Sequence, residues 1–146
     1  MNTKLLNSIP LFETLNEAES EILASRIELR QFPENSLIIN EGEETNSLYI
    51  ILSGKVKIFL LGESGEEVIL NFLSEGDYFG EVSMFGDGER SASVLTLSDA
   101  YFAVLEKDDF VELMTSHPKL GLTIIKGATH RLQSLSHNVR SLAANW

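Results

Sequence analysis

The chain has 146 residues, a hydrophobic fraction of 43% and a formal net charge of −11 at pH 7. This length and composition fit one domain with a sizeable hydrophobic core. The absence of cysteine excludes disulfides, iron–sulfur clusters and cysteine-ligated zinc. The first ten residues lack the long apolar segment of a signal peptide, and no stretch approaches the length of a membrane span, so we expect a cytoplasmic protein.

The acidic charge argues against binding of nucleic acid through the general field of this chain, because phosphate contacts need many Lys and Arg side chains. The charge is uneven, since Glu112 is the last acidic residue. Four cations follow it, at Lys119, Lys126, Arg131 and Arg140. On a long helix they indicate a solvated face, so we expect neither direct DNA binding nor membrane binding by this chain.

The first element expected is a helix over about 16–25, because Asn16 followed by Glu19 is typical of a capped N-terminus. Short runs of alternating or continuous apolar residues follow, and turn-forming residues bound each of them. The expected strands are 27–32, 37–39, 47–52, 55–61, 66–73, 92–97 and 100–105. This series predicts a mainly β fold with flanking helices, built as an antiparallel jelly-roll barrel.

A glycine-punctuated loop interrupts the strands between Leu73 and Ala92. It carries Glu81 near one end and Arg90 with Ser91 at the other. The Arg90 guanidinium can hold two oxygens of one phosphate, and a carboxylate beside a phosphate site can accept a hydrogen bond from a sugar hydroxyl. The residues after Glu81 can form one short helical turn. The spacing favours a ribose-phosphate clamp; the alternative is a solvated surface pair worth under about 1 kcal/mol.

After Glu106 the apolar period changes from 2 to 3.6, which predicts a short helix opening at Lys107 and a second one starting at Pro118. Apolar residues then recur in strict 3-4 alternation: Ile125, Ala128, Leu132, Leu135, Val139, Leu142 and Trp146. This stripe predicts a parallel homodimer through a C-terminal helix. The alternative is that the helix folds back on its own barrel. We therefore divide the chain into a jelly-roll domain, 1–116, and a dimerisation helix, 117–146.

The three histidines do not form a metal site in this scheme. His117, His130 and His137 all lie in the helical tail, whereas a metal-dependent cupin-like enzyme needs His ligands on the strands. The expected strands carry none. We therefore expect no metal cofactor and no catalytic activity.

The segments Phe79-Gly80-Glu81 and Glu89-Arg90-Ser91-Ala92 resemble the phosphate-binding cassette of the cyclic-nucleotide-binding domain in the bacterial catabolite activator family of regulators. The similarity extends from about Ile9 to Trp146. It implies a cyclic nucleotide sensor whose ligand binding is coupled to rearrangement of the dimer helices. It also implies the following site: Arg90, Ser91 and the Ala92 N–H on the cyclic phosphate, Glu81 and the Gly80 backbone on the ribose, and Ile58 and Leu70 beside the base.

Two features of the sequence differ from the family pattern: the residue at position 135 and the end of the sequence at Trp146. Members specific for cAMP place adjacent hydroxyl residues on the dimer helix at the positions of Leu135 and Ser136, and only Ser136 keeps one. The expected ligand is therefore a cyclic nucleotide, with cAMP first and cGMP, another nucleotide or weak cAMP binding as the alternatives. Family regulators also continue into a helix-turn-helix domain, whereas this sequence stops at Trp146, which predicts either the sensor part of a transcription factor or a stand-alone binding protein. The competing interpretation is a ligand-independent dimerisation module with a vestigial pocket.

Overall fold

The computed structural model describes residues 1–86 and 88–126. It begins with two short helical elements, α1 (Thr3–Asn7) and the 3-10 helix η1 (Pro10–Phe12), neither of which was predicted. Helix α2 (Glu17–Arg26) confirms the predicted capped helix. The Asn16 side chain accepts a hydrogen bond from the Glu19 N–H at 2.8 Å, and the Glu19 carboxylate accepts one from the Asn16 N–H at 3.1 Å.

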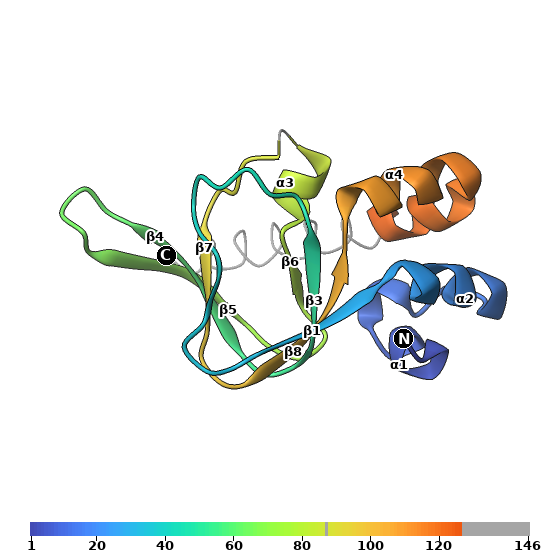
Figure 1. Cartoon of the computed structure of the whole chain (residues 1–146), viewed down its shortest axis with the longest axis horizontal. Coiled ribbons are helices and arrows are strands. Elements are labelled where there is room, and N and C mark those ends of the chain that lie inside the picture. The colour runs from blue at the N-terminus through green and yellow to red at the C-terminus, as the bar shows by residue number, and fades with distance from the viewer. Residues whose placement is uncertain (87, 127–146) are drawn as a thin grey trace, which may run out of the picture.

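In the described residues, eight strands form two four-stranded antiparallel sheets. One sheet has the order β1-β8-β3-β6 and the other β2-β7-β4-β5, which confirms the jelly-roll prediction. The strands are β1 (Glu28–Phe32), β2 (Leu37–Ile39), β3 (Leu48–Ser53), β4 (Val56–Leu61), β5 (Glu67–Leu73), β6 (Tyr78–Phe79), β7 (Ser93–Thr96) and β8 (Ala100–Leu105). Every strand except β6 was predicted. The β4–β5 hairpin projects from the body of the molecule (Figure 1).

Strand β3 is buried on both faces and separates two hydrophobic clusters. Leu48 and Ile50 point to one face, where they pack in a cluster with residues of α2 and α4. Tyr49 and Ile51 point to the other face and pack between the two sheets. The alternation of strand side chains therefore joins the helical layer to the jelly roll through one central strand.

Helix α4 (Lys107–Ser116) follows β8 directly, and residues 118–126 form a second helical segment, as predicted. The rest of the apolar stripe, with Leu135 and Ser136, lies outside the described residues. Figure 1 shows α2 and α4 side by side, with the jelly roll on one flank of the pair. In the described part of the chain, no helix combines the length and apolar character needed to cross a membrane.

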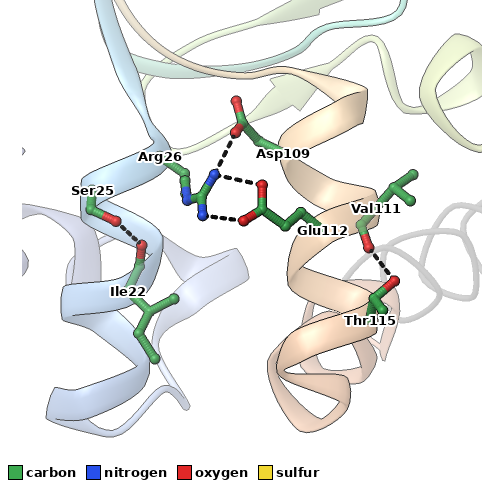
Figure 2. Close-up of polar contacts among 7 residues, drawn as sticks. All are labelled: Ile22, Ser25, Arg26, Asp109, Val111, Glu112 and Thr115. Atoms are coloured by element: carbon green, nitrogen blue, oxygen red, sulfur yellow. Dashed lines mark hydrogen bonds and ion pairs between the residues drawn. The ribbon is translucent and has the colours of Figure 1, made fainter.

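An ion-pair cluster joins α2 to α4 (Figure 2). Arg26 Nη1 lies 3.1 Å from Asp109 Oδ1 and 2.7 Å from Glu112 Oε2, and Arg26 Nη2 contacts the second Glu112 oxygen. The guanidinium thus binds one carboxylate through two nitrogens and a second carboxylate through one. This cluster ties the N-terminal helices to the helix that leads toward the C-terminus.

Candidate functional site

A pocket of about 180 Å³ opens between the β4–β5 hairpin, helix α3 (Glu81–Phe85) and the segment that leads into β7. Every predicted site residue that the structure describes lines it. These residues are Ile58, Leu70, Gly80, Glu81, Arg90, Ser91 and Ala92. The eighth predicted residue, Ser136, lies outside the described residues.

Gly80 is the N-cap residue of the short helix α3, and this helix confirms the turn predicted after Glu81. Its φ of +96° is a left-handed conformation that favours glycine. A Cβ atom at this position would lie 2.5 Å from the Ser47 carbonyl oxygen and 2.8 Å from Arg90 Nη1. The glycine therefore permits both the turn into α3 and the close approach of the arginine.

Arg90 is a buried residue, with only 3% of its surface exposed. Its Nε donates to Thr45 Oγ1 at 2.7 Å, its Nη2 to the Ser47 carbonyl at 2.9 Å and its Nη1 to the Gly80 carbonyl at 3.3 Å. The interpretation of Arg90 as part of a solvated surface pair is therefore wrong. The side chain is held by three neutral acceptors at the wall of the pocket.

Among the described residues, the partners of Arg90 are neutral. Among residues 1–86 and 88–126, no carboxylate forms an ion pair with it. Burial lowers the pKa of the Arg90 guanidinium, whereas Tyr49, Glu43, Glu106 and Glu81 act in the opposite direction from longer range. A buried cation that has only neutral partners is costly unless an anion joins it. This arrangement favours an anionic ligand.

The segment 42–47 holds the arginine in place through backbone pairing as well. The Gly42 N–H donates to the Arg90 carbonyl, and the Arg90 N–H donates to the Glu43 carbonyl, both at 2.9 Å. Thr45 and Ser47 were not predicted as site residues. They stand more than forty positions before Arg90, and no local pattern in the sequence connects them to it.

The remaining walls of the pocket differ in character. Ser83 Oγ donates to the Glu89 carbonyl at 2.8 Å and so tethers α3 to the loop before Arg90. Ser91 is exposed, and Glu81 is partly exposed. Ile58 and Leu70 come from the β4–β5 hairpin and form an apolar side with Ile39 and Val94. The pocket thus offers a cation, a carboxylate, a hydroxyl and an apolar wall, a set of groups that matches the phosphate, sugar and base of a nucleotide.

A second, larger hollow of about 770 Å³ lies beside η1 and the β5–β6 turn. Its charged lining residues are Glu13, Glu75, Asp77 and Lys126, and it contains none of the predicted site residues. Within the described ranges there is no group of three or more His, Asp or Glu side chains that could hold a metal ion.

Comparisons with known proteins show the family of the chain. Residues 29–117 match the family model described as "Cyclic nucleotide-binding domain". The "cAMP-activated global transcriptional regulator CRP" of Pasteurella multocida (strain Pm70) is 32% identical over 124 residues, which cover 84% of this chain and 59% of that protein. The chain thus spans well under two thirds of the length of this relative.

Solved structures show the same fold. The crystal structure of Thermus thermophilus Catabolite Activator Protein has a TM-score of 0.76 and 30% identity, over 92% of this chain and 63% of that one. The regulatory domain of Toxoplasma gondii PKA, solved with cAMP, has a TM-score of 0.67 and 26% identity, over 75% of this chain and 42% of that one. The family match runs from the second residue of β1 to the end of α4 and includes all the described residues that line the Arg90 pocket. The chain belongs to the cyclic nucleotide-binding domain family.

Proposed function

We propose that the Arg90 pocket binds a cyclic nucleotide, cAMP or cGMP, and that the chain is the sensor domain of a transcriptional regulator. The observation that carries this proposal is Arg90 itself, a buried cation with only neutral hydrogen-bond partners among the described residues, at the wall of a pocket. A cyclic phosphate supplies the missing negative charge. One relative is described as a cAMP-activated regulator, and a PKA regulatory domain of the same fold was solved with cAMP. Both support the same ligand class.

Different residues of the pocket bind the phosphate, the ribose and the base of the nucleotide. Arg90, Ser91 and the Ala92 N–H bind the cyclic phosphate, because guanidinium, hydroxyl and amide groups are all donors to its oxygens. Glu81 and the Gly80 backbone bind the ribose, whose hydroxyl donates to the carboxylate. Ile58 and Leu70 pack against the base. Ser136, which lies outside the described residues, stays a predicted contact of the base.

The signal passes from the pocket to the C-terminal helix, which forms a homodimer. A direct contact supports this route: the Phe85 ring at the end of α3 packs on the Phe110 ring of α4, with centroids 5.2 Å apart. A ligand that shifts α3 therefore acts on α4 through packed side chains. In a full-length regulator, a separate domain makes the DNA contacts, and this chain performs no catalysis.

Calorimetric titration of the purified chain with cAMP and then cGMP tests the proposal. We expect micromolar binding of at least one nucleotide and a loss of more than about 100-fold in affinity for Arg90→Ala, since charge-assisted hydrogen bonds are worth about 1.5–3 kcal/mol each. Arg26→Ala is the matched control, because Arg26 lies between α2 and α4 and outside the pocket. Circular dichroism checks that each variant is folded.

The second candidate function is a ligand-independent dimerisation module. One observation favours it: three donors of Arg90 already bind Thr45, Ser47 and Gly80, so the arginine has a structural role without any ligand. Folded wild-type protein that binds neither cAMP nor cGMP would establish this alternative and contradict the sensor proposal.

A further inference from the structure

A continuous set of hydrogen bonds runs from Arg90 to the start of α4. Arg90 Nη2 donates to the Ser47 carbonyl at 2.9 Å, and the Ser47 hydroxyl donates to Glu106 Oε2 at 2.7 Å. Glu106 is the N-cap residue of α4. A single buried serine thus contacts Arg90 at the pocket with its backbone and the N-cap residue of α4 with its side chain.

The topology of the jelly roll brings Ser47 and Glu106 together. Strands β3 and β8 are antiparallel neighbours, and Leu48 pairs with Leu105 at one end of their ladder. Ser47 precedes Leu48 and Glu106 follows Leu105, so the two residues stand opposite each other just beyond the last pair. The position of Ser47 relative to the helix is therefore set by the central sheet.

Glu106 uses its side chain in an unusual way for an N-cap residue. Such residues usually accept a hydrogen bond from the N–H groups of the first helical turn, but Glu106 makes no side-chain cap bond. Its second oxygen accepts from Arg30 Nη2 at 3.2 Å instead. Because Arg30 lies on strand β1, this bond anchors the Glu106 carboxylate to the sheet. Arg30 also binds Glu28, a residue of the same strand, at 2.9 Å. The side chain is thus directed toward Ser47 and the sheet and away from its own helix.

We propose that the Ser47–Glu106 hydrogen bond couples the Arg90 end of the pocket to the N-terminus of α4, which makes Glu106 a positioning residue for the response of that helix to nucleotide. This inference rests on the proposed function, because it concerns the regulation of the same site. When the Arg90 guanidinium moves toward a phosphate, it pulls on the Ser47 carbonyl to which it is hydrogen-bonded, and Ser47 is displaced. The Ser47 hydroxyl transmits the displacement to the residue that starts α4.

Ser47→Ala separates the two roles of this serine. The substitution keeps the carbonyl that binds Arg90 and removes only the hydroxyl that binds Glu106. Glu106→Ala cuts the same bond from the other side without removing a helix cap, since Glu106 makes none. Glu28→Ala is the matched control, because it removes the other carboxylate bound to Arg30 and leaves the Ser47–Glu106 bond in place.

The experiment measures hydrogen exchange of the α4 amides in the full chain with and without saturating cAMP, after calorimetry has established binding. We expect cAMP to change α4 exchange in the wild type and in Glu28→Ala. In Ser47→Ala and Glu106→Ala, the ligand-induced change shrinks at least about threefold while the affinity falls by less than about 10-fold. A merely structural role would alter exchange equally with and without ligand.

The outcomes separate the two proposals. If the folded wild type binds neither cAMP nor cGMP, the proposed function fails and this inference fails with it. If the wild type binds and Ser47→Ala keeps the full α4 response, only the inference is overturned. Phe85→Ala identifies the route in that case, since loss of the response there assigns the coupling to the Phe85–Phe110 ring contact.

Discussion

At the scale of single residues, the site depends on how Arg90 is held as much as on Arg90 itself. Thr45 Oγ1 accepts the hydrogen bond from Arg90 Nε at 2.7 Å. Loss of this acceptor leaves a buried guanidinium nitrogen without its partner, and an unsatisfied buried donor costs about 1–3 kcal/mol. Thr45 is thus expected to matter although it lies outside the predicted loop.

Replacing Thr45 by Val keeps the shape of the side chain and removes the acceptor. We expect Thr45→Val to lower the free energy of unfolding by about 1–2 kcal/mol and to weaken cAMP binding several-fold, because the arginine loses one of its three anchors. Thr115→Val is the control, since Thr115 is exposed on α4 and its hydroxyl bonds only the Val111 carbonyl (Figure 2). Equal effects of the two variants in urea unfolding and calorimetry would contradict this role.

Gly80 permits a second prediction at the same scale. Gly80→Ala places a Cβ atom against the Ser47 carbonyl and Arg90 Nη1 and also forces an L residue into a left-handed conformation. Gly65→Ala is subject to a similar backbone strain at φ +83°, but its Cβ meets nothing within 4 Å. We expect Gly80→Ala to cost more than the roughly 1 kcal/mol expected for Gly65→Ala and to weaken nucleotide binding, while Gly65→Ala leaves binding unchanged. Urea unfolding and calorimetry compare the two variants, and matched results would refute the steric argument.

The sequence predicted those site residues that stand close together along the chain or that match a family motif. Glu81, Arg90, Ser91 and Ala92 share one loop, and their chemistry is visible from residue type and spacing. Thr45 and Ser47 act through a hydroxyl and a carbonyl that almost any turn offers. Their role arises from the pairing of segment 42–47 with the loop at Arg90, and only the folded chain shows that pairing.

At the scale of elements, periodicity located every strand except the two-residue strand β6. Strand β6 has two residues, Tyr78 and Phe79, which is too few for an alternating pattern. It exists because both residues pair with β3 and because the Phe79 ring stacks on the Tyr49 ring, with centroids 5.1 Å apart. Strand β5 was located correctly, but its apolar run does not predict that six of its seven residues are exposed on a projecting hairpin.

The contact between α2 and α4 gives a prediction about pH. Hydrogen bonds from Arg26 hold the pKa of the Glu112 carboxyl below its ordinary value. A carboxyl whose pKa is lower in the folded state stabilises the fold above the unfolded pKa, and this contribution is lost as the pH falls through the folded pKa. The ion pair between the helices therefore strengthens the fold near neutral pH and weakens in acid.

Thermal unfolding at about pH 7 and about pH 3 tests this effect. We expect Glu112→Gln to lower the midpoint near neutral pH and to converge with the wild type in acid. Glu21→Gln serves as control, because Glu21 is exposed on α2 and belongs to none of the ion pairs in the described residues. A constant difference between Glu112→Gln and wild type at both pH values would show that the charge of Glu112 is not the cause.

At the scale of the whole molecule, the sensor proposal requires an output that reaches another copy of the chain. The apolar stripe from Ile125 to Trp146 predicts that output as a two-stranded coiled coil. All but its first residue lies outside the described residues, so the homodimer and the division into 1–116 and 117–146 stay predictions. Ile125 packs against the cluster that contains Phe110 and Leu113 of α4, which places the start of the stripe next to the helix whose N-cap residue is Glu106.

Val139→Asp tests the coiled coil at a position inside the stripe. A buried carboxylate at a seam position is costly, so we expect the dimer seen by sedimentation equilibrium to become a monomer. Ser141→Asp adds the same charge two residues further on, away from the stripe, and should leave the dimer intact. A monomeric wild type, or a dimer that survives Val139→Asp, would favour a helix folded back on its own jelly roll. In that case nucleotide binding would have to act within one chain, and the α4 response should be the same at every protein concentration.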